Sequence, residues 1–174
     1  TPFAPKALFL TGEIKEKKHK DYSAAIVQYR LSVDTYPSGD HAVAALWRIA
    51  EINIDRLDNY AAGIGTFKEI AEKYPHDPRA IEALEEAAKT YRRKLRDAEN
   101  AAATLAQLAE KYPNDEKAPQ RLFEAGELLK DEPEHYQKAI AYFERVVEKY
   151  PSHRRAEKAR DEMAKIKEKM AEKK

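Results

Sequence analysis

The dipeptide Tyr-Pro recurs at a constant interval along this chain, as in the stretches IAEKYPHDPRA (residues 70–80) and LAEKYPNDEKA (residues 108–118). Its four copies lie at 36–37, 74–75, 112–113 and 150–151, so each follows the previous one by 38 residues. A fixed period of this length is typical of proteins built from stacked structural repeats. We therefore divide the chain into copies 3–40, 41–78, 79–116 and 117–154, followed by a partial copy at 155–174.

Each copy carries two apolar stripes whose members are three or four residues apart. In copy two the first stripe is Ala45, Leu46, Ile49 and Ala50, and the second is Tyr60, Gly63, Ile64 and Phe67. This spacing places the residues on one face of a helix. The pattern predicts one antiparallel helix pair per copy, with the second helix ending at Tyr-Pro because proline lacks an N–H and clashes with the preceding turn.

Short polar residues and small residues mark the ends and the contacts of these helices. We expect Asp40, Asp77 and Asp115 to cap the helices that follow them, because a carboxylate accepts hydrogen bonds from free N–H groups. Small residues recur where the two helices of a pair would meet, which predicts close approach of their backbones. They are Gly12, Ala50, Ala88 and Gly126 in the first helices and Ala25, Gly63, Ala101 and Ala139 in the second.

Composition excludes several classes of protein. The chain of 174 residues has 32 Lys+Arg and 31 Asp+Glu, a net charge of +1, which argues against a protein that coats nucleic acid or an anionic membrane. No apolar run approaches the roughly 18 residues of a membrane span. Cysteine is absent, which excludes thiolate catalysis, cysteine zinc sites and disulfides. Because the chain begins Thr1-Pro2-Phe3, we expect a processed protein or an excised domain, with any lipid anchor outside it.

No constellation of residues predicts catalysis, a metal site or a cofactor site. The five histidines fall in expected turns or at helix starts, without the spacing of metal ligands: His19, His41, His76, His135 and His153. The chain also has no glycine-rich phosphate loop and no nucleophile elbow. We expect a protein that is not an enzyme.

The densest positive stretch lies late in the first helix of copy three. Its members are Lys89, Arg92, Arg93, Lys94 and Arg96. One interpretation is that the stretch binds phosphate or an acidic segment of a partner. The other is that it is a solvated helix end whose cations complement the helix dipole. Neighbouring acidic residues dilute its field and favour the second reading.

The last segment, 155–174, carries a narrow stripe of Ala156, Ala159, Met163, Ile166 and Met170. Such a stripe suits either a coiled-coil seam or a helix that caps the last repeat with a polar outer face. The cap is favoured because the stripe is short and rich in alanine. We expect the isolated chain to be a monomer.

The repeat pattern resembles the tetratricopeptide family. Copy four matches its signature through Leu122, Ala125, Gly126, Leu129, Tyr136, Ala139, Phe143 and Pro151. The 38-residue period is longer than the family's 34 residues. Stretched repeats closed by Tyr-Pro are similar to those of bacterial cell-envelope proteins, such as the periplasmic coordinator of the Tol–Pal system and the lipoprotein that assists outer-membrane barrel assembly. The resemblance implies a periplasmic or envelope location, with the cytoplasm as the alternative.

The resemblance implies an all-α, right-handed superhelix of four helix pairs plus a C-terminal capping helix, in a single domain, 1–174. In that family the first helices line a concave groove that binds a partner. Carried over by position, the groove residues are Phe9, Glu13, Glu16, Trp47, Glu51, Ile54, Glu85, Lys89, Arg92, Phe123, Glu127 and Lys130. On the other interpretation, Phe9, Trp47 and Phe123 only broaden the buried stripe between neighbouring pairs.

These observations predict a non-enzymatic scaffold that binds a peptide segment or a protein surface, with the groove acidic over the first two copies and more basic over the third. Two alternatives remain open. The repeats could form a rigid spacer between other domains, or the groove could serve as the pocket of a ligand-binding protein or an enzyme.

Overall fold

The computed structural model describes residues 4–172, and within this range it contains helices and no strand. The α-helices are α1 (Ala4–Lys17), α2 (Tyr22–Thr35), α3 (Ala42–Asp55), α4 (Tyr60–Lys73), α5 (Arg79–Thr90), α6 (Ala98–Lys111), α7 (Ala118–Glu127), α8 (Tyr136–Lys149) and α9 (Arg154–Glu172). A π-helical turn, η1 (Tyr91–Leu95), and a 3₁₀ turn, η2 (Pro133–His135), complete the list. The predicted all-helical fold class is confirmed.

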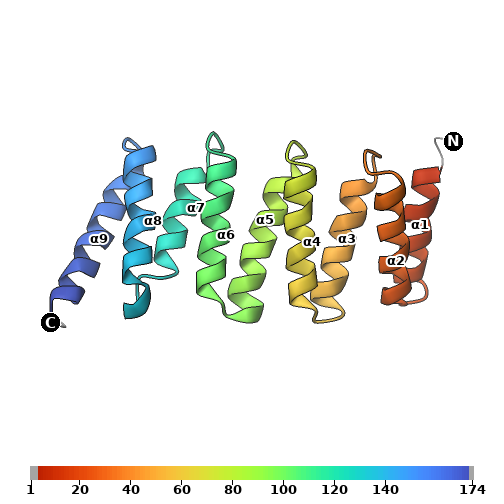
Figure 1. Ribbon diagram of the computed structural model, residues 1–174, viewed down its shortest axis with the longest axis horizontal. Helices are drawn as coiled ribbons and strands as arrows, with labels where there is room; N and C mark the ends of the chain where they lie inside the picture. Colours follow the sequence, from red (N-terminus) through yellow and green to blue (C-terminus); the bar gives the residue numbers. More distant parts are fainter. Residues whose placement is uncertain (1–3, 173–174) are drawn as a thin grey trace. The chain divides into compact units, whose positions relative to one another are not determined.

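The helices form two compact units, α1–α5 and η1 with α6–α9. In the first unit α1 packs on α2, α2 on α3, α3 on α4 and α4 on α5; in the second, α6 packs on α7, α7 on α8 and α8 on α9. Successive helices within each unit run antiparallel (Figure 1). This nearest-neighbour packing of helix pairs is the arrangement of an α-α solenoid.

The Tyr-Pro pairs end the second helices, as predicted. Helices α2, α4, α6 and α8 each stop at the residue before the tyrosine, which then occupies the C-cap position. The next helix begins after a short turn, and no helix of the described part continues through one of these prolines.

The turn inside each of the first three pairs has a common construction. Lys20, Asp58 and Arg96 adopt left-handed backbone conformations, with φ of 52°, 49° and 54°. The residue that follows each of them caps the second helix by accepting a hydrogen bond from an N–H three residues on; these are Asp21, Asn59 and Asp97. Copy four departs from this plan, because its first helix ends early at Glu127 and the turn runs through η2.

Two of the three carboxylates predicted to cap first helices act near the helix start. Asp77 accepts a 2.9 Å hydrogen bond from the N–H of Arg79, and Asp115 accepts one of 2.9 Å from the N–H of Lys117. The prediction for Asp40 is wrong. The residue at the N-cap of α3 is His41, whose side chain makes no cap hydrogen bond, and Asp40 lies one position too early.

The C-terminal helix packs as the predicted cap requires. α9 contacts α8 and α7, and it starts at Arg154, one residue before the expected boundary. Ala156, Ala159 and Ile166 are buried, whereas Met163 and Met170 remain partly exposed. None of the helices between residues 4 and 172 combines the length and the apolar character that crossing a membrane requires.

Candidate partner-binding clefts

The aromatic residues at the predicted groove positions each pack on the aromatic residue of the second helix in their own pair. Phe9 lies 5.3 Å from Tyr29, Trp47 lies 5.0 Å from Phe67, and Phe123 lies 5.3 Å from Phe143, measured between ring centroids. Phe9 also stacks on His41 at 5.0 Å. These contacts with the second helices fix the orientation of the three rings. Phe9 and Trp47 keep part of their surface exposed, whereas Phe123 is only 4% exposed.

A connected polar network crosses the first helices of the first unit. The indole Nε1 of Trp47 donates a 3.0 Å hydrogen bond to Glu51, one helical turn further along α3. The guanidinium of Arg48 pairs with Glu51 and reaches across to Glu16 on α1. Glu16 also accepts a 2.8 Å hydrogen bond from the hydroxyl of Tyr29. The network ties α1, α2 and α3 together and orients the indole.

This network explains why Glu16 is not available at the surface. Its carboxylate is buried and shared between Arg48 and Tyr29. Burial, followed by the hydrogen bond to Glu16, raises the pKa of Tyr29 well above its ordinary value. Burial opposes the charge of Arg48, but the hydrogen bond to Glu16 and the field of Glu51 outweigh it and raise the pKa of Arg48. Arg48 therefore keeps its positive charge beside Glu16 and Glu51 across the physiological pH range.

A small cleft of about 110 Å³ opens beside the network, on the surface shared by α1 and α3. Glu16, Arg48, Glu51, Ile52, Asp55 and Arg56 line it. Two of the six are predicted groove residues, Glu16 and Glu51. Glu13 lies half-buried on the same helix as Glu16 and pairs with Lys17, while Ile54 is buried against the second helix of its pair at Gly63.

A larger cleft of about 330 Å³ lies between α7 and α9 in the second unit. It is lined by Phe123, Glu127, Arg155, Lys158, Asp161, Glu162 and Lys165. The guanidinium carbon of Arg155 sits 4.8 Å from the centre of the Phe123 ring, a cation–π contact that forms one wall. Lys130 pairs with Glu127 at 2.8 Å and with Glu162 at 2.9 Å, so it links α7 to α9. Phe123 and Glu127 are both predicted groove residues.

The sequence predicts only a capping role for α9, and the α9 residues of this cleft are therefore not among the predicted groove residues. The signal was present in the repeat. Continuing the 38-residue step from Phe123 and Glu127 leads to Asp161 and Lys165, and both line the cleft. α9 is therefore a first helix in its position as well as a cap.

The remaining predicted groove residues lie around the junction of α5 and η1. Lys89 is exposed at the end of α5 and pairs with Glu86 at 2.6 Å, and Glu85 on the same helix is half-buried. Arg92, in η1, pairs with Glu124 of α7 at 2.9 Å. The other cations of the basic stretch, Arg93, Lys94 and Arg96, are exposed, as a solvated helix end predicts.

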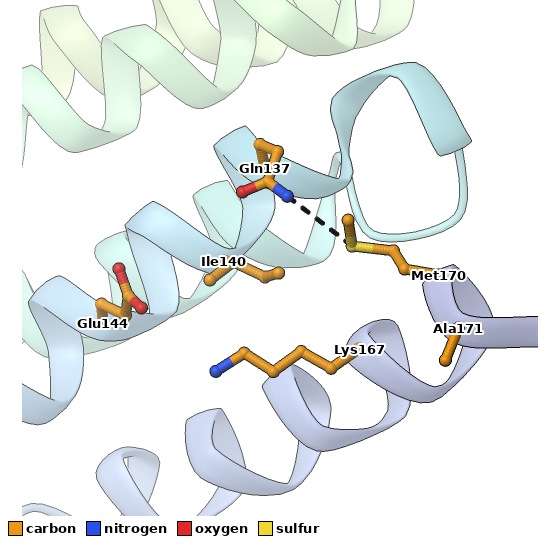
Figure 2. A pocket seen from close by; sticks show the side chains of 6 residues that line it. All are labelled: Gln137, Ile140, Glu144, Lys167, Met170 and Ala171. Atoms are coloured by element: carbon orange, nitrogen blue, oxygen red, sulfur yellow. Dashed lines mark hydrogen bonds between the residues drawn. The ribbon is translucent and has the colours of Figure 1, made fainter. Parts of the chain in front are cut away.

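A third cleft, of about 420 Å³, separates α8 from α9 and contains no predicted groove residue. Figure 2 shows Gln137, Ile140 and Glu144 of α8 facing Lys167, Met170 and Ala171 of α9. The amide Nε2 of Gln137 donates a 3.8 Å hydrogen bond to Sδ of Met170 across it.

Among residues 4–172, one group of side chains brings three possible metal ligands together, namely Glu132, Glu134 and His135, whose ligand atoms lie within 4.8 Å of one another. Both carboxylates are exposed and all three residues belong to the turn around η2. We assign no metal to this turn, because exposed acidic groups cluster commonly in solvent.

The comparison with protein families identifies a match over the later part of the chain. Residues 56–174 match the family described as YfiO, outer membrane lipoprotein, a range that contains α4 to α9 in full. No curated protein matches the chain. The match covers more than half of the chain and agrees with the tandem helix pairs, so the chain belongs to the outer membrane lipoprotein family YfiO.

Proposed function

We propose that this protein is a non-enzymatic scaffold of the bacterial cell envelope that binds a peptide segment or a protein surface along its first helices. One observation supports this most. In each unit a cleft opens between two successive first helices, and each cleft contains two of the residues expected to face a partner, Glu16 and Glu51 or Phe123 and Glu127. Family membership supports the envelope setting, and we propose a periplasmic location within it.

The chemistry of the clefts suits a polypeptide more than a small molecule. Both are open, and both are lined mainly by charged side chains that already pair with one another. Charged side chains of this kind determine the orientation of a bound partner and its association rate. Partly exposed aromatic rings supply most of the binding energy. Among the three aromatic residues at predicted groove positions, Phe9 and Trp47 are partly exposed, whereas Phe123 is buried beneath the second cleft.

The charge pattern favours a partner with a defined direction. In the first unit Glu16 is buried and paired with Arg48. The acidic groups that keep exposed surface are Asp55 and, each paired with a cation, Glu13 and Glu51. Lys89 and Arg92 supply positive charge further along the chain. We therefore propose that the partner places a basic stretch beside α1 and α3, apolar anchors on Phe9 and Trp47, and acidic residues near Lys89.

Site-specific photo-crosslinking in bacterial cells tests the proposal. A photoreactive amino acid replaces Glu51 or Glu127 on the first helices, and matched chains carry it at Ala61 or Ala103, exposed positions of second helices. We expect the first-helix positions to yield one common envelope protein and the second-helix positions to yield none. Equal yields from both sets, or no crosslink from the first helices, would contradict the groove assignment and favour a rigid spacer.

Once that partner is identified, Trp47 reports its binding directly, because it is the only tryptophan of the chain. Titration should shift its fluorescence, and Trp47→Ala should weaken binding by about 2 kcal/mol if the ring is an anchor. Circular dichroism of the variant separates this result from unfolding. Loss of helicity without a selective binding defect would instead assign Trp47 to the core.

A further inference from the structure

The turn that leads into α9 has a histidine where the corresponding turns of earlier repeats have an aspartate. In steps of 38 residues this position is Asp77, Asp115 and His153. Two residues later stand Arg79 in copy three and Arg155 in the last segment. An arginine therefore follows a carboxylate at the start of α5 and an imidazole at the start of α9.

In copy three the carboxylate of Asp77 binds both the backbone and the side chain of Arg79. Its Oδ1 accepts a 2.9 Å hydrogen bond from the backbone N–H of Arg79 and one of 3.1 Å from Nε, and its Oδ2 accepts one of 3.1 Å from Nη2. One carboxylate thus caps α5 and holds the guanidinium in a bidentate pair. The two roles together use both carboxylate oxygens.

His153 replaces Asp77 in the first of these roles but not in the second. Its Nδ1 accepts a 3.2 Å hydrogen bond from the backbone N–H of Arg155, and a neutral imidazole has no second acceptor to offer the side chain. The guanidinium carbon of Arg155 lies instead 4.8 Å from the centre of the Phe123 ring. Its buried Nε has no hydrogen-bond partner among the described residues. A buried donor without an acceptor is destabilising, so this arginine lacks a carboxylate that its counterpart has.

The acids around Arg155 do not supply that carboxylate. Arg155 lines the cleft of about 330 Å³ between α7 and α9, which we call the α7–α9 cleft. Two of the three acids that line it are paired with lysines. Glu127 pairs with Lys130, and Glu162 pairs with Lys130 and Lys165. The third acid of the lining is exposed, and none of the three accepts a hydrogen bond from the buried Nε.

We propose that Arg155 binds an aspartate or glutamate side chain of the partner polypeptide in the α7–α9 cleft, in the role that Asp77 has for Arg79. This inference rests on the proposed function, because the carboxylate belongs to the partner that the first helices bind. Lys158, one helical turn after Arg155, is exposed on the same lining and adds a second positive charge. The ring of Phe123 supports the guanidinium from its apolar side, so the planar fork is already oriented for a carboxylate.

A side-chain carboxylate suits this cleft better than the C-terminal carboxylate of a partner. A terminal carboxylate would bring the backbone amide of its own residue into the cleft. The lining has no amide or hydroxyl side chain to pair with that backbone, since its members are Phe123 and charged residues. An aspartate or glutamate reaches the guanidinium through one or two methylene groups while its backbone remains in solvent.

Solution NMR of the whole chain tests this proposal. The probe is an acetylated and amidated peptide of about eight residues, with two aspartates among glycines and serines. The Nε–H signal of Arg155, identified by its loss in Arg155→Lys, should shift on titration. The amide signals of α7 and α9 give the affinity, and we expect Arg155→Lys to weaken binding about tenfold or more, because lysine lacks the planar fork. The same peptide with asparagines in place of the aspartates should not bind.

Two further variants separate a role of Arg155 from a general effect of charge. Arg154→Lys is the matched control, because Arg154 is an exposed neighbour outside the cleft lining. Its affinity for the probe should stay within about twofold of wild type. His153→Asp supplies the carboxylate that Asp77 supplies in copy three, and it should weaken binding about tenfold although Arg155 is present.

Equal affinity of wild type and Arg155→Lys, or an Arg155 signal that does not shift, would overturn the proposal. A peptide with asparagines and a free C-terminal carboxylate that binds as tightly as the aspartate probe would overturn the assignment to a side chain. These results are distinct from a failure of the proposed function. If the probe does not bind while Glu51 and Glu127 still crosslink to one envelope protein, only the carboxylate site is wrong, whereas loss of those crosslinks contradicts the scaffold itself.

Discussion

The hydroxyl of Tyr74 donates a 2.7 Å hydrogen bond to the backbone carbonyl of Pro37, the proline of the preceding Tyr-Pro pair. In the second unit Tyr150 makes the same bond to Pro113 at 3.1 Å. In these two pairs the proline follows the end of a helix, and the tyrosine hydroxyl attaches that end to the repeat before it.

Removing this hydroxyl should loosen the contact between repeats. We expect Tyr74→Phe to lower the free energy of unfolding by about 1 kcal/mol, the net contribution of one such hydrogen bond. Tyr36→Phe is the control, because no Tyr-Pro pair precedes it in the sequence. Urea unfolding followed by circular dichroism measures both, and equal losses would contradict a role for the hydroxyl bond.

Two glycines in helices should respond to alanine with opposite signs. A Cβ on Gly126 would lie 2.6 Å from Cε1 of Phe143, a ring that is fully buried, whereas a Cβ on Gly65 would meet no atom within 4 Å. We expect Gly126→Ala to destabilise by about 1–2 kcal/mol through overpacking. Gly65→Ala should stabilise α4 by roughly 0.5–1 kcal/mol. Thermal unfolding compares them, and stabilisation by Gly126→Ala would show that Phe143 yields easily.

The left-handed residue in the first turn offers a stabilising substitution. Lys20 has φ of 52°, a conformation that costs an L-residue about 1–2 kcal/mol. Lys20→Gly removes this strain but adds freedom to the unfolded chain, so we expect a net gain of roughly 0.5–1 kcal/mol. Lys15→Gly, inside α1, should instead destabilise by about 1 kcal/mol. Chemical denaturation distinguishes the two, and a loss on Lys20→Gly would argue against the left-handed turn.

Part of the loss of stability at acid pH should come from protonation of the Glu69 carboxylate. Partial burial disfavours its carboxylate, but hydrogen bonds from Arg30, at 2.8 Å, and from Lys73 prevail and lower the pKa of Glu69. A lowered folded-state pKa gives stability that is complete above the unfolded-state pKa and is lost as the pH falls through the folded-state value. The advantage of wild type over Glu69→Gln should therefore be complete above the ordinary glutamate pKa of about 4.3 and be lost as the pH falls from there through the lowered folded-state pKa. An unchanged difference at low pH would contradict the ion pair.

The buried residue of the C-terminal cap should matter more than its exposed neighbours. Ile166 is 1% exposed, whereas Met163 keeps part of its surface in solvent. We expect Ile166→Ala to cost about 2–4 kcal/mol and Met163→Ala about 1 kcal/mol or less. Hydrogen exchange should show that α9 opens first in the Ile166 variant. Equal effects of the two substitutions would mean that Ile166 is not the main packing contact of α9.

The helix pairs were predictable because they depend on local sequence features, and these features recur in every copy of the repeat. The period of Tyr-Pro located the ends of four helices, and the two stripes of each copy located their buried faces. The turns of copies three and four were not predictable in this way. The π-helical turn from Tyr91 and the early end of α7 at Glu127 have no counterpart in the other copies.

For the candidate site, the positions on the first helices were predictable but the accessibility of each side chain was not. Glu16 has the composition and spacing of a surface acid, yet Tyr29 and Arg48 enclose it. Phe123 and Ile54 are likewise buried, while Phe9 and Trp47 keep exposed surface. Periodicity assigns a residue to a helix face, whereas burial depends on the size of what lies opposite.

The sequence by itself determined the helix pairs, their order and the face of each helix that packs, because hydrophobic periodicity and proline act within a few residues along the chain. Only the tertiary structure decided which charges pair across repeats, which groove residues remain accessible and which buried donor lacks an acceptor. Arg48 meets Glu16 across 32 residues of sequence, and the guanidinium of Arg155 lies on the ring of Phe123 from another helix. Such relations arise between elements, and no local pattern records them.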